Sequence, residues 1–220
     1  MGTPLPFREE PETAKLLDDA ARGDSSAVGR LLEQHRERLT RMVRLRLDPR
    51  ARGRVGASDV LQEAFVDALD RIEEYYAHPD VPFYVWLRFL VGQRILRVHR
   101  HHMRAKKRAV ARELSLEAVT WPQASSLSIA EELIASGDSP SRAAAFAELQ
   151  QRLVAALESM APTDREILVL RHVEQLSNVQ VAAILNLEIS AASKRYVRAL
   201  RKLRAILGES GFSGISGGSE

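Results

Sequence analysis

Between Ser177 and Leu207 the sequence has the marks of two helices joined by a sharp turn. Ser177 and Gln180 have capping-box spacing, in which each side chain bonds to the backbone N–H of the other residue. Apolar residues then recur at helical spacing, and Asn186 can take the left-handed conformation that turns a chain sharply. The pattern predicts a short helix, a tight turn and a second, longer helix.

The second helix, expected to begin between Glu188 and Ser190, has an apolar side and a basic side. Tyr196, Leu200, Leu203 and Leu207 form the apolar side, and the basic residues are Lys194, Arg195, Arg198, Arg201 and Lys202. Small residues at its start would let the backbone approach a groove: Ser190, Ala191, Ala192 and Ser193. A recognition helix needs this construction, because its first residues meet base edges while basic residues reach phosphates. The alternative is an ordinary amphipathic helix with a solvated basic side; the order of short helix, turn and basic helix favours DNA.

The composition favours helices throughout. The chain is 45% apolar, 28% charged and only 5% aromatic, and no run of alternating β-branched residues predicts a sheet. A second capping box is expected at Thr163 and Glu166. The sequence contains no cysteine, which excludes disulfides and thiolate metal sites. We predict an all-α protein of two small helical domains joined by a flexible linker, the C-terminal one a helix-turn-helix.

Composition also divides the chain into segments. The expected order is a disordered tail (1–12), a helical domain (13–112), a linker with one short helical pattern (113–142), the helix-turn-helix domain (143–207) and a Gly/Ser-rich disordered tail (208–220). In the first domain two helices are expected between Glu12 and Leu47, with a cap among residues 24–26. A third helix is capped by Ser58, and a fourth runs from Phe83 to Arg108.

Charge is distributed unevenly, although the formal net charge is only +3. Acidic residues dominate from Asp59 to Asp80, where Arg71 is the one basic residue. Two later stretches, 81–112 and 189–207, are basic and contain no acidic residue. Alternating acidic and basic surfaces suggest more than one macromolecular partner.

Catalytic and metal-binding constellations are missing. His99, His101 and His102 have neither the spacing of a helical metal pair nor that of a zinc finger, so we interpret them as solvated or phosphate-facing. Gly137-Asp138-Ser139 is a turn signal rather than a nucleophile elbow. We expect no enzyme activity, no metal and no cofactor. Without a secretory signal or an apolar run that could span a bilayer, the expected location is the cytoplasm, with no membrane partner.

In these two blocks of helices the sequence resembles a bacterial RNA polymerase sigma factor of the extracytoplasmic-function group. In the second block the resemblance covers residues 157–171, 176–185 and 192–200, which are similar to the family's fourth region. In the first block, residues 58–65 (SDVLQEAF) resemble the polymerase-binding segment, and residues 83–90 (FYVWLRFL) with the basic helix after them resemble the promoter-melting segment. Both blocks occur in the right order.

The resemblance implies that the chain binds core RNA polymerase and promoter DNA and starts transcription. Its implied polymerase contacts are Asp59, Gln62, Glu63 and Asp67. The implied contacts to the downstream promoter element are Gln93, Arg94, Arg97, Arg100 and Arg104, and those to the upstream element are Ser190, Ser193, Lys194, Arg195 and Arg198. A flipped base would be held against the loop around His78 to Pro82. Phe83 and Trp86 invite a stacking hypothesis, but their spacing favours the core. An anti-sigma protein commonly restrains members of this family.

The sequence departs from the family's pattern at several contacts. Gln93 replaces the usual Asn, Arg97 stands where an acidic residue is frequent, and residues 191–195 read Ala-Ala-Ser-Lys-Arg instead of Thr-Val-Lys-Ser-Arg. Glu188 replaces the usual cap, which makes Ser190 an alternative cap. Two other functions stay open: a helix-turn-helix regulator that does not act as a sigma subunit, and a helical adaptor with no DNA role.

Overall fold

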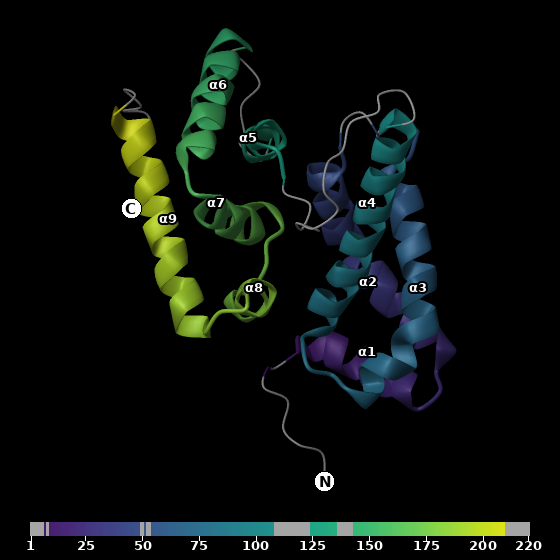
Figure 1. Ribbon diagram of the computed structural model, residues 1–220. Coiled ribbons are helices and arrows are strands. Elements are labelled where there is room, and N and C mark those ends of the chain that lie inside the picture. Colours follow the sequence, from purple (N-terminus) through teal and green to yellow (C-terminus); the bar gives the residue numbers. More distant parts are fainter. Residues whose placement is uncertain are drawn as a thin grey trace. The chain divides into compact units, whose positions relative to one another are not determined.

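The structure, a computed structural model, describes residues 7, 9–48, 51, 54–107, 124–135 and 143–209. Every regular element in these ranges is a helix, which confirms the all-α prediction. The chain divides into two compact units, unit 1 (Met1–Gln123) and unit 2 (Ala124–Glu220). Both are shown in Figure 1.

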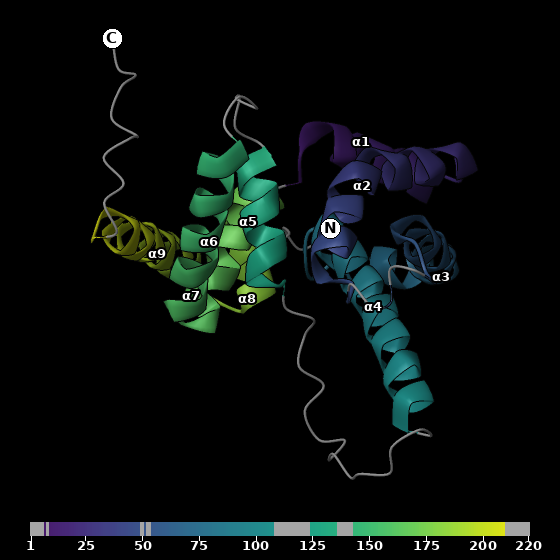
Figure 2. The same ribbon diagram turned by 90° about the horizontal axis from the view of Figure 1, so that it is seen from above.

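Unit 1 is a helical bundle. Its helices are α1 (Pro11–Ala21), α2 (Ser25–Arg46), α3 (Ala57–Ala77) and α4 (Phe83–Lys107). Helix α2 packs on α1, α3 and α4, and α3 also packs along α4. Seen from above, the C-terminal half of α4 extends away from α1 (Figure 2).

The helix starts in unit 1 follow local capping chemistry. Asp24 caps α2 by accepting a hydrogen bond from the Ser26 N–H at 2.9 Å, within the predicted segment. The predicted cap of α3 is wrong: Gly56, not Ser58, is the N-cap. Asp59 is then the third helical residue, and its carboxylate accepts from the Gly56 N–H at 2.8 Å. Asp59 satisfies a backbone donor that the helix itself leaves free.

The core of unit 1 is built from the apolar stripes of its helices. Burying these side chains is the main favourable term in folding the bundle. The apolar side chains of α2, α3 and α4 that are almost completely inaccessible to solvent include Ala27, Leu31, Leu39, Met42, Val43, Val60, Leu61, Ala64, Ala68, Phe83, Tyr84, Leu87, Val91 and Ile95. Ile95 is the last buried residue of α4 in the part of this helix whose side chains the structure describes. The basic half of α4 therefore begins where the core ends.

Residues 9–12 differ from the predicted disordered tail. Helix α1 begins at Pro11, and Glu9 bonds to a segment more than seventy residues away. Its carboxylate accepts from the Phe83 N–H at 2.5 Å and from the Tyr75 hydroxyl at 3.3 Å. Glu9 thus caps α4 from outside the helix, which sequence spacing cannot show because the partners are remote. The rest of the predicted tail, residues 1–6 and 8, lies outside the described residues.

Unit 2 contains the predicted helix-turn-helix. Its elements are α5 (Ser126–Ala135), α6 (Ala143–Ser159), α7 (Pro162–Leu168), a π-helical turn η1 (Val169–Val173), α8 (Asn178–Leu185) and α9 (Ile189–Glu209). Helix α9 packs on α6, α7 and α8. Helix α9 also extends to Glu209, past the predicted end at Leu207, and residues 210–220 lie outside the described residues.

Helix α5 falls inside the stretch 113–142 that we predicted to be a linker. It packs on α6, with Ile129 and Ala130 buried, and the Arg165 guanidinium donates to the Ser126 hydroxyl at 3.1 Å. Unit 2 therefore begins near Ala124 instead of residue 143. The short helical pattern expected in this segment is therefore confirmed, but the helix belongs to unit 2, to which its buried residues Ile129 and Ala130 attach it.

The two predicted capping boxes of unit 2 had different outcomes. The one at Thr163 and Glu166 is wrong, because Pro162 occupies the first turn of α7 and Ala161 is the N-cap, with no side-chain hydrogen bond. The one at Ser177 and Gln180 is confirmed, with reciprocal bonds of 3.2 and 3.0 Å. Asn186 is left-handed as predicted, with φ of 51°. The capping residues thus predicted both ends of α8 correctly.

Candidate functional site

The start of α9 is joined directly to α8. The Asn178 side-chain amide donates to the Ile189 carbonyl at 2.9 Å and to the Ser193 hydroxyl at 2.8 Å. These two bonds fix the first turn of α9 against the first turn of α8. Ser190 is the second residue of α9, so the alternative that it caps the helix is wrong.

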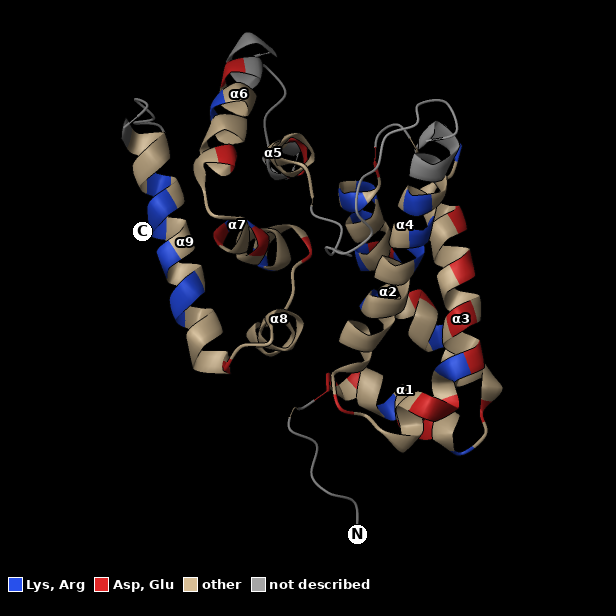
Figure 3. Ribbon diagram, viewed as in Figure 1, with Lys and Arg blue, Asp and Glu red and all other residues tan. Residues whose placement is uncertain are grey.

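The side chains predicted to meet the upstream DNA element lie mostly in solvent. Ser190, Ser193, Lys194 and Arg198 are exposed, and Arg195 is half-buried. The Ser193 hydroxyl already accepts from Asn178, so it also positions the helix. Ala192 differs from the prediction: it is fully buried and packs inward instead of facing a groove. Figure 3 shows the Lys and Arg residues along α9.

Helix α9 is held in unit 2 by polar and aromatic contacts. The Tyr196 hydroxyl lies 3.0 Å from His172 Nε2, and the Arg171 guanidinium lies 5.2 Å from the centre of the Tyr196 ring. The Lys202 ammonium pairs with Asp164 at 3.7 Å. The predicted apolar residues Leu200, Leu203 and Leu207 are only half-buried. Lys202 is thus partly neutralised, whereas Lys194 and Arg198 remain exposed at the start of the helix.

Helix α4 presents a mixed aromatic and basic face. Gln93 is half-buried, and Arg97 and Arg100 are exposed. Arg104 belongs to α4 but lies outside the described side chains. Phe89, which sequence reasoning missed, lies on the same helical face as Gln93 and is 50% exposed. The sequence could have shown this, because helical spacing puts Phe89 outside the buried stripe of Leu87, Leu90 and Val91.

Phe83 and Trp86 lie in an aromatic cluster. Phe83 is fully buried, and its ring centre lies 5.5 Å from that of Trp86 and 5.4 Å from that of Tyr75. Trp86 is half-buried and also packs on Tyr75 at 5.1 Å. Core packing, the favoured interpretation, is therefore what the structure shows for Phe83.

Arg94 does not lie free on the DNA face. Its Nε donates to Asp67 Oδ2 at 2.6 Å, its Nη2 donates to Asp67 Oδ1, and its Nη1 donates to Glu63 Oε2 at 3.0 Å. These hydrogen bonds hold the pKa of the Asp67 carboxyl below its usual value. The structure thus joins one predicted DNA contact to two predicted polymerase contacts, Asp67 and Glu63, across the α3–α4 interface.

The outward face of α3 is acidic with an apolar centre. Asp59, Gln62 and Glu63 are exposed, whereas Asp67 is turned toward α4 and its side chain is 19% exposed. Val66, which sequence reasoning missed, and Leu69, which its helical spacing assigned to the buried stripe, are 52% and 50% exposed on this face. Apolar residues at these two positions of an otherwise polar stripe were the available signal.

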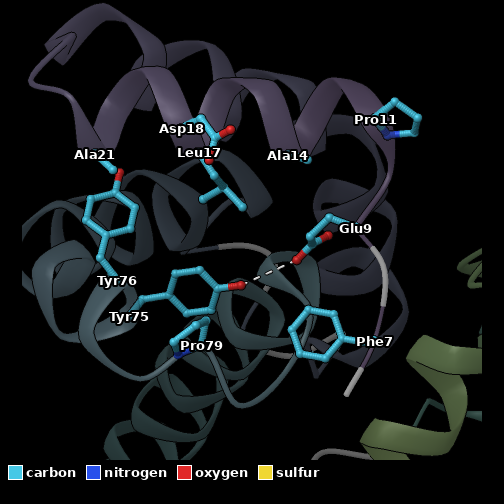
Figure 4. A pocket seen from close by; sticks show the side chains of 10 residues that line it. All are labelled: Phe7, Glu9, Pro11, Ala14, Leu17, Asp18, Ala21, Tyr75, Tyr76 and Pro79. Atoms are coloured by element: carbon cyan, nitrogen blue, oxygen red, sulfur yellow. Dashed lines mark hydrogen bonds between the residues drawn. The ribbon is translucent and has the colours of Figure 1, made fainter. Parts of the chain in front are cut away.

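A pocket of about 530 Å³ lies beside the loop after α3 (Figure 4). It lies between α1 and the end of α3, and Tyr75, Tyr76 and Pro79 form one wall. Glu9 lies at its edge, with the hydrogen bond to Tyr75 drawn in Figure 4. Burial raises the pKa of the Glu9 carboxyl.

Within the described residues, no cluster of three His, Asp or Glu side chains could hold a metal ion. His99 has a structural partner instead: its Nε2 accepts from the Asp48 N–H at 3.0 Å. None of the described helices is long and apolar enough to cross a membrane.

The chain is similar in sequence to known sigma factors. The family model for sigma-70 region 4 matches residues 150–203, which include α7, α8 and most of α9. The chain is 27% identical over 192 residues to the RNA polymerase sigma factor CnrH of Cupriavidus metallidurans, covering 87% of this chain and 92% of that protein. It is 29% identical to the ECF RNA polymerase sigma factor SigD of Mycobacterium tuberculosis, covering 86% of this chain and 81% of that protein.

Two further comparisons also cover most of this chain. A probable RNA polymerase sigma factor, RfaY of Xanthomonas campestris, is 33% identical over 86% of this chain, which spans 42% of that protein. The solved structure of CnrH in complex with the cytosolic domain of CnrY has a TM-score of 0.52 and 23% identity, covering 91% of this chain and 99% of that chain. This likeness extends the shared fold over both units. The chain belongs to the extracytoplasmic-function group of RNA polymerase sigma factors, which direct RNA polymerase to promoters.

Proposed function

We propose that the two units divide the work of the sigma factor. Unit 1 binds core polymerase through α3 and the downstream promoter element through α4, and unit 2 binds the upstream element through α9. The observation that carries this division is the placement of the basic residues. Exposed cations lie along α9 from Lys194 onward and along the second half of α4, whereas the outward face of α3 carries acidic residues (Figure 3).

The proposed polymerase surface is the outward face of α3. Val66 and Leu69 would form its apolar centre, with Asp59, Gln62 and Glu63 as a polar rim. Protein interfaces commonly have this arrangement, because a desolvated apolar centre supplies affinity and charged residues around it steer the partner. Asp67 is the one predicted contact that this face does not present.

The proposed downstream DNA surface is the outward face of α4. Arg97, Arg100 and Arg104 would contact phosphates, and Gln93 can reach a base edge. Phe89 offers a half-exposed ring on which an unpaired base can stack. A base that leaves the duplex would be received by the loop His78–Pro82, next to the pocket that Glu9 and Tyr75 border.

The proposed upstream surface is the first half of α9. Ser190 and Lys194 lie at its N-terminal end, where a recognition helix meets base edges, and Arg195 and Arg198 follow where phosphates would pass. Ser193 would act there partly through Asn178. We place this function in the cytoplasm, where polymerase and promoters meet. The solved CnrH structure is a complex with the cytosolic domain of CnrY, and this favours a protein partner besides core polymerase for this chain too.

In vitro transcription with core RNA polymerase and a library of randomised promoters tests this proposal. The full chain should co-purify with core enzyme and select a two-part promoter from the library. A chain that binds duplex DNA without starting transcripts would be a helix-turn-helix regulator. A chain that does neither would be an adaptor, and either result would overturn the division of labour.

A further inference from the structure

We propose that Arg94 is a positioning residue that holds α4 against α3 and does not bind DNA. In this proposal Asp67 is its structural counterpart and not a polymerase contact. The inference rests on the proposed function of unit 1, since it concerns which side chains of α3 and α4 remain for polymerase and promoter.

The hydrogen bonds of Arg94 occupy the part of its guanidinium that would read DNA. A guanidinium binds phosphate or guanine best through two parallel N–H groups. Arg94 uses its Nε and Nη2 groups on the two oxygens of Asp67, and its Nη1 donates to Glu63. A phosphate could take this edge only by displacing a carboxylate that carries the same sign of charge.

Burial separates Arg94 from its basic neighbours. The side chains of Arg94 and Asp67 are each 19% exposed, whereas that of Arg97 is 49% exposed. Arg97 also lies 4.0 Å from Asp67, so the same carboxylate orients an exposed cation of the DNA face. The partly buried pair is screened less by salt than the cations in solvent.

The Arg94–Asp67 pair lies where it can control the direction of the basic half of α4. It lies next to Ile95, after which α4 has no buried side chain among those described. Beyond that point His99 is held by the Asp48 backbone at the end of α2. Arg94 on the α3 side and His99 on the α2 side thus hold the helix at the start of its basic half, and they set the direction in which Arg97 and Arg100 point.

The salt dependence of promoter binding distinguishes a positioning role from a DNA contact. Each phosphate contact that is lost reduces the slope of log affinity against log salt by about 0.9. With holoenzyme and a promoter recovered from the library, Arg94→Gln should lower affinity about tenfold and leave the slope unchanged. The matched control Arg100→Gln should reduce the slope. A smaller slope for Arg94→Gln would overturn the proposal.

The direction in which Asp67→Asn changes promoter affinity gives a second test. If Asp67 only repelled DNA, removing its charge would tighten promoter binding. If it holds Arg94, Asp67→Asn should weaken promoter binding as Arg94→Gln does, while affinity for core polymerase stays unchanged in both variants. Tighter promoter binding, or a loss of core affinity confined to the Asp67 variant, would contradict the proposal. The exchanged pair Asp67→Arg with Arg94→Asp should recover part of the lost affinity.

Hydrogen exchange of the free chain tests the same role without polymerase or promoter. In Arg94→Gln the backbone amides of α4 after Ile95 should exchange faster, and those of α2 and the first half of α4 should not. Unchanged exchange throughout α4 would overturn the positioning role. Failure of the wild-type chain to select a promoter would instead refute the proposed function, and the exchange measurement would still decide the role of Arg94.

Discussion

The Asn178 side-chain amide donates to the Ser193 hydroxyl at 2.8 Å and thereby joins the first turn of α8 to the first turn of α9. The same amide also holds the Ile189 carbonyl at 2.9 Å. A recognition helix can read bases only if its first turn is aimed correctly, and the tight turn at Asn186 leaves that direction to such contacts. Asn178 is therefore a structural determinant of the DNA-reading surface.

Replacing Asn178 by Ala should lower affinity for the upstream promoter element and leave core binding unchanged. The variant loses two hydrogen bonds, each of which contributes about 1 kcal/mol to a fold. Holoenzyme binding to a promoter fragment and to a fragment with a scrambled upstream element measures the effect. Asn178→Ala should lower the preference for the intact fragment, and an unaltered preference would show that α8 does not aim α9.

Lys194→Ala, Arg195→Ala and Arg198→Ala should each weaken binding to the upstream element by about 1–3 kcal/mol where the side chain contacts a base, and less where it contacts a phosphate. The matched control is Lys202→Ala, because Lys202 lies further along the same helix and pairs with Asp164. Gel-shift titration of holoenzyme measures the four affinities, and affinity for core polymerase should stay constant. An equal loss in the Lys202 control would indicate a general charge effect.

Leu69→Asp should impair association with core polymerase without unfolding unit 1. The side chain is 50% exposed, so the fold loses little, whereas a charge at the apolar centre of an interface must be desolvated. Competition for core enzyme against wild-type chain measures the change. The control is Glu74→Gln, at an exposed position on the same helix. If Leu69→Asp associates normally with core polymerase, the outward face of α3 does not bind polymerase.

Phe89→Ala should slow promoter opening more than it weakens binding of the closed duplex. Its ring is 50% exposed beside Gln93, and stacking on an unpaired base contributes about 1–3 kcal/mol. Permanganate reactivity of unpaired thymines measures opening, and a pre-melted bubble template should restore activity. If the bubble template fails to restore it, Phe89 acts in the fold and not on a base.

Local chemistry predicted the helices of both units well. The capping box at Ser177 and the left-handed Asn186 are set by neighbouring residues, and both were visible in the sequence. Pro162 shows the limit of this reasoning, because a proline in the first turn displaced the cap expected at Thr163. The short helical pattern of α5 was visible in the sequence, but its place in unit 2 was not, because that depends on the burial of Ile129 against another helix.

The functional surfaces were predicted less completely, because exposure depends on how helices pack. The family resemblance placed Asp67 and Arg94 on two separate surfaces, and only the α3–α4 interface shows that they bind each other. Phe89 and Leu69 were missed for the opposite reason, since an apolar residue is assigned to the core until the structure shows it in solvent.

His35 gives the last prediction, a loss of stability of unit 1 on acidification. The residue is 3% exposed, and burial, followed by the nearby Arg38, lowers its pKa to about 4 from 6.5. Its Nε2 is buried without a hydrogen-bond partner, and its ring packs on Phe83 and Tyr84. The neutral form is thus the one that the fold accommodates.

The sign of the pH dependence follows from the lowered pKa of His35. Between pH 6.5 and 4 the unfolded chain binds a proton that the folded chain rejects, so this stability is present above 6.5 and is lost as pH falls toward 4. The full shift corresponds to about 3 kcal/mol. Urea unfolding followed by Trp86 fluorescence in a Trp121→Phe background measures it. His35→Leu should flatten the pH dependence, whereas His101→Gln, an exposed histidine of the same unit, controls for removing a histidine as such. A slope that persists in His35→Leu would assign the acid sensitivity to other groups.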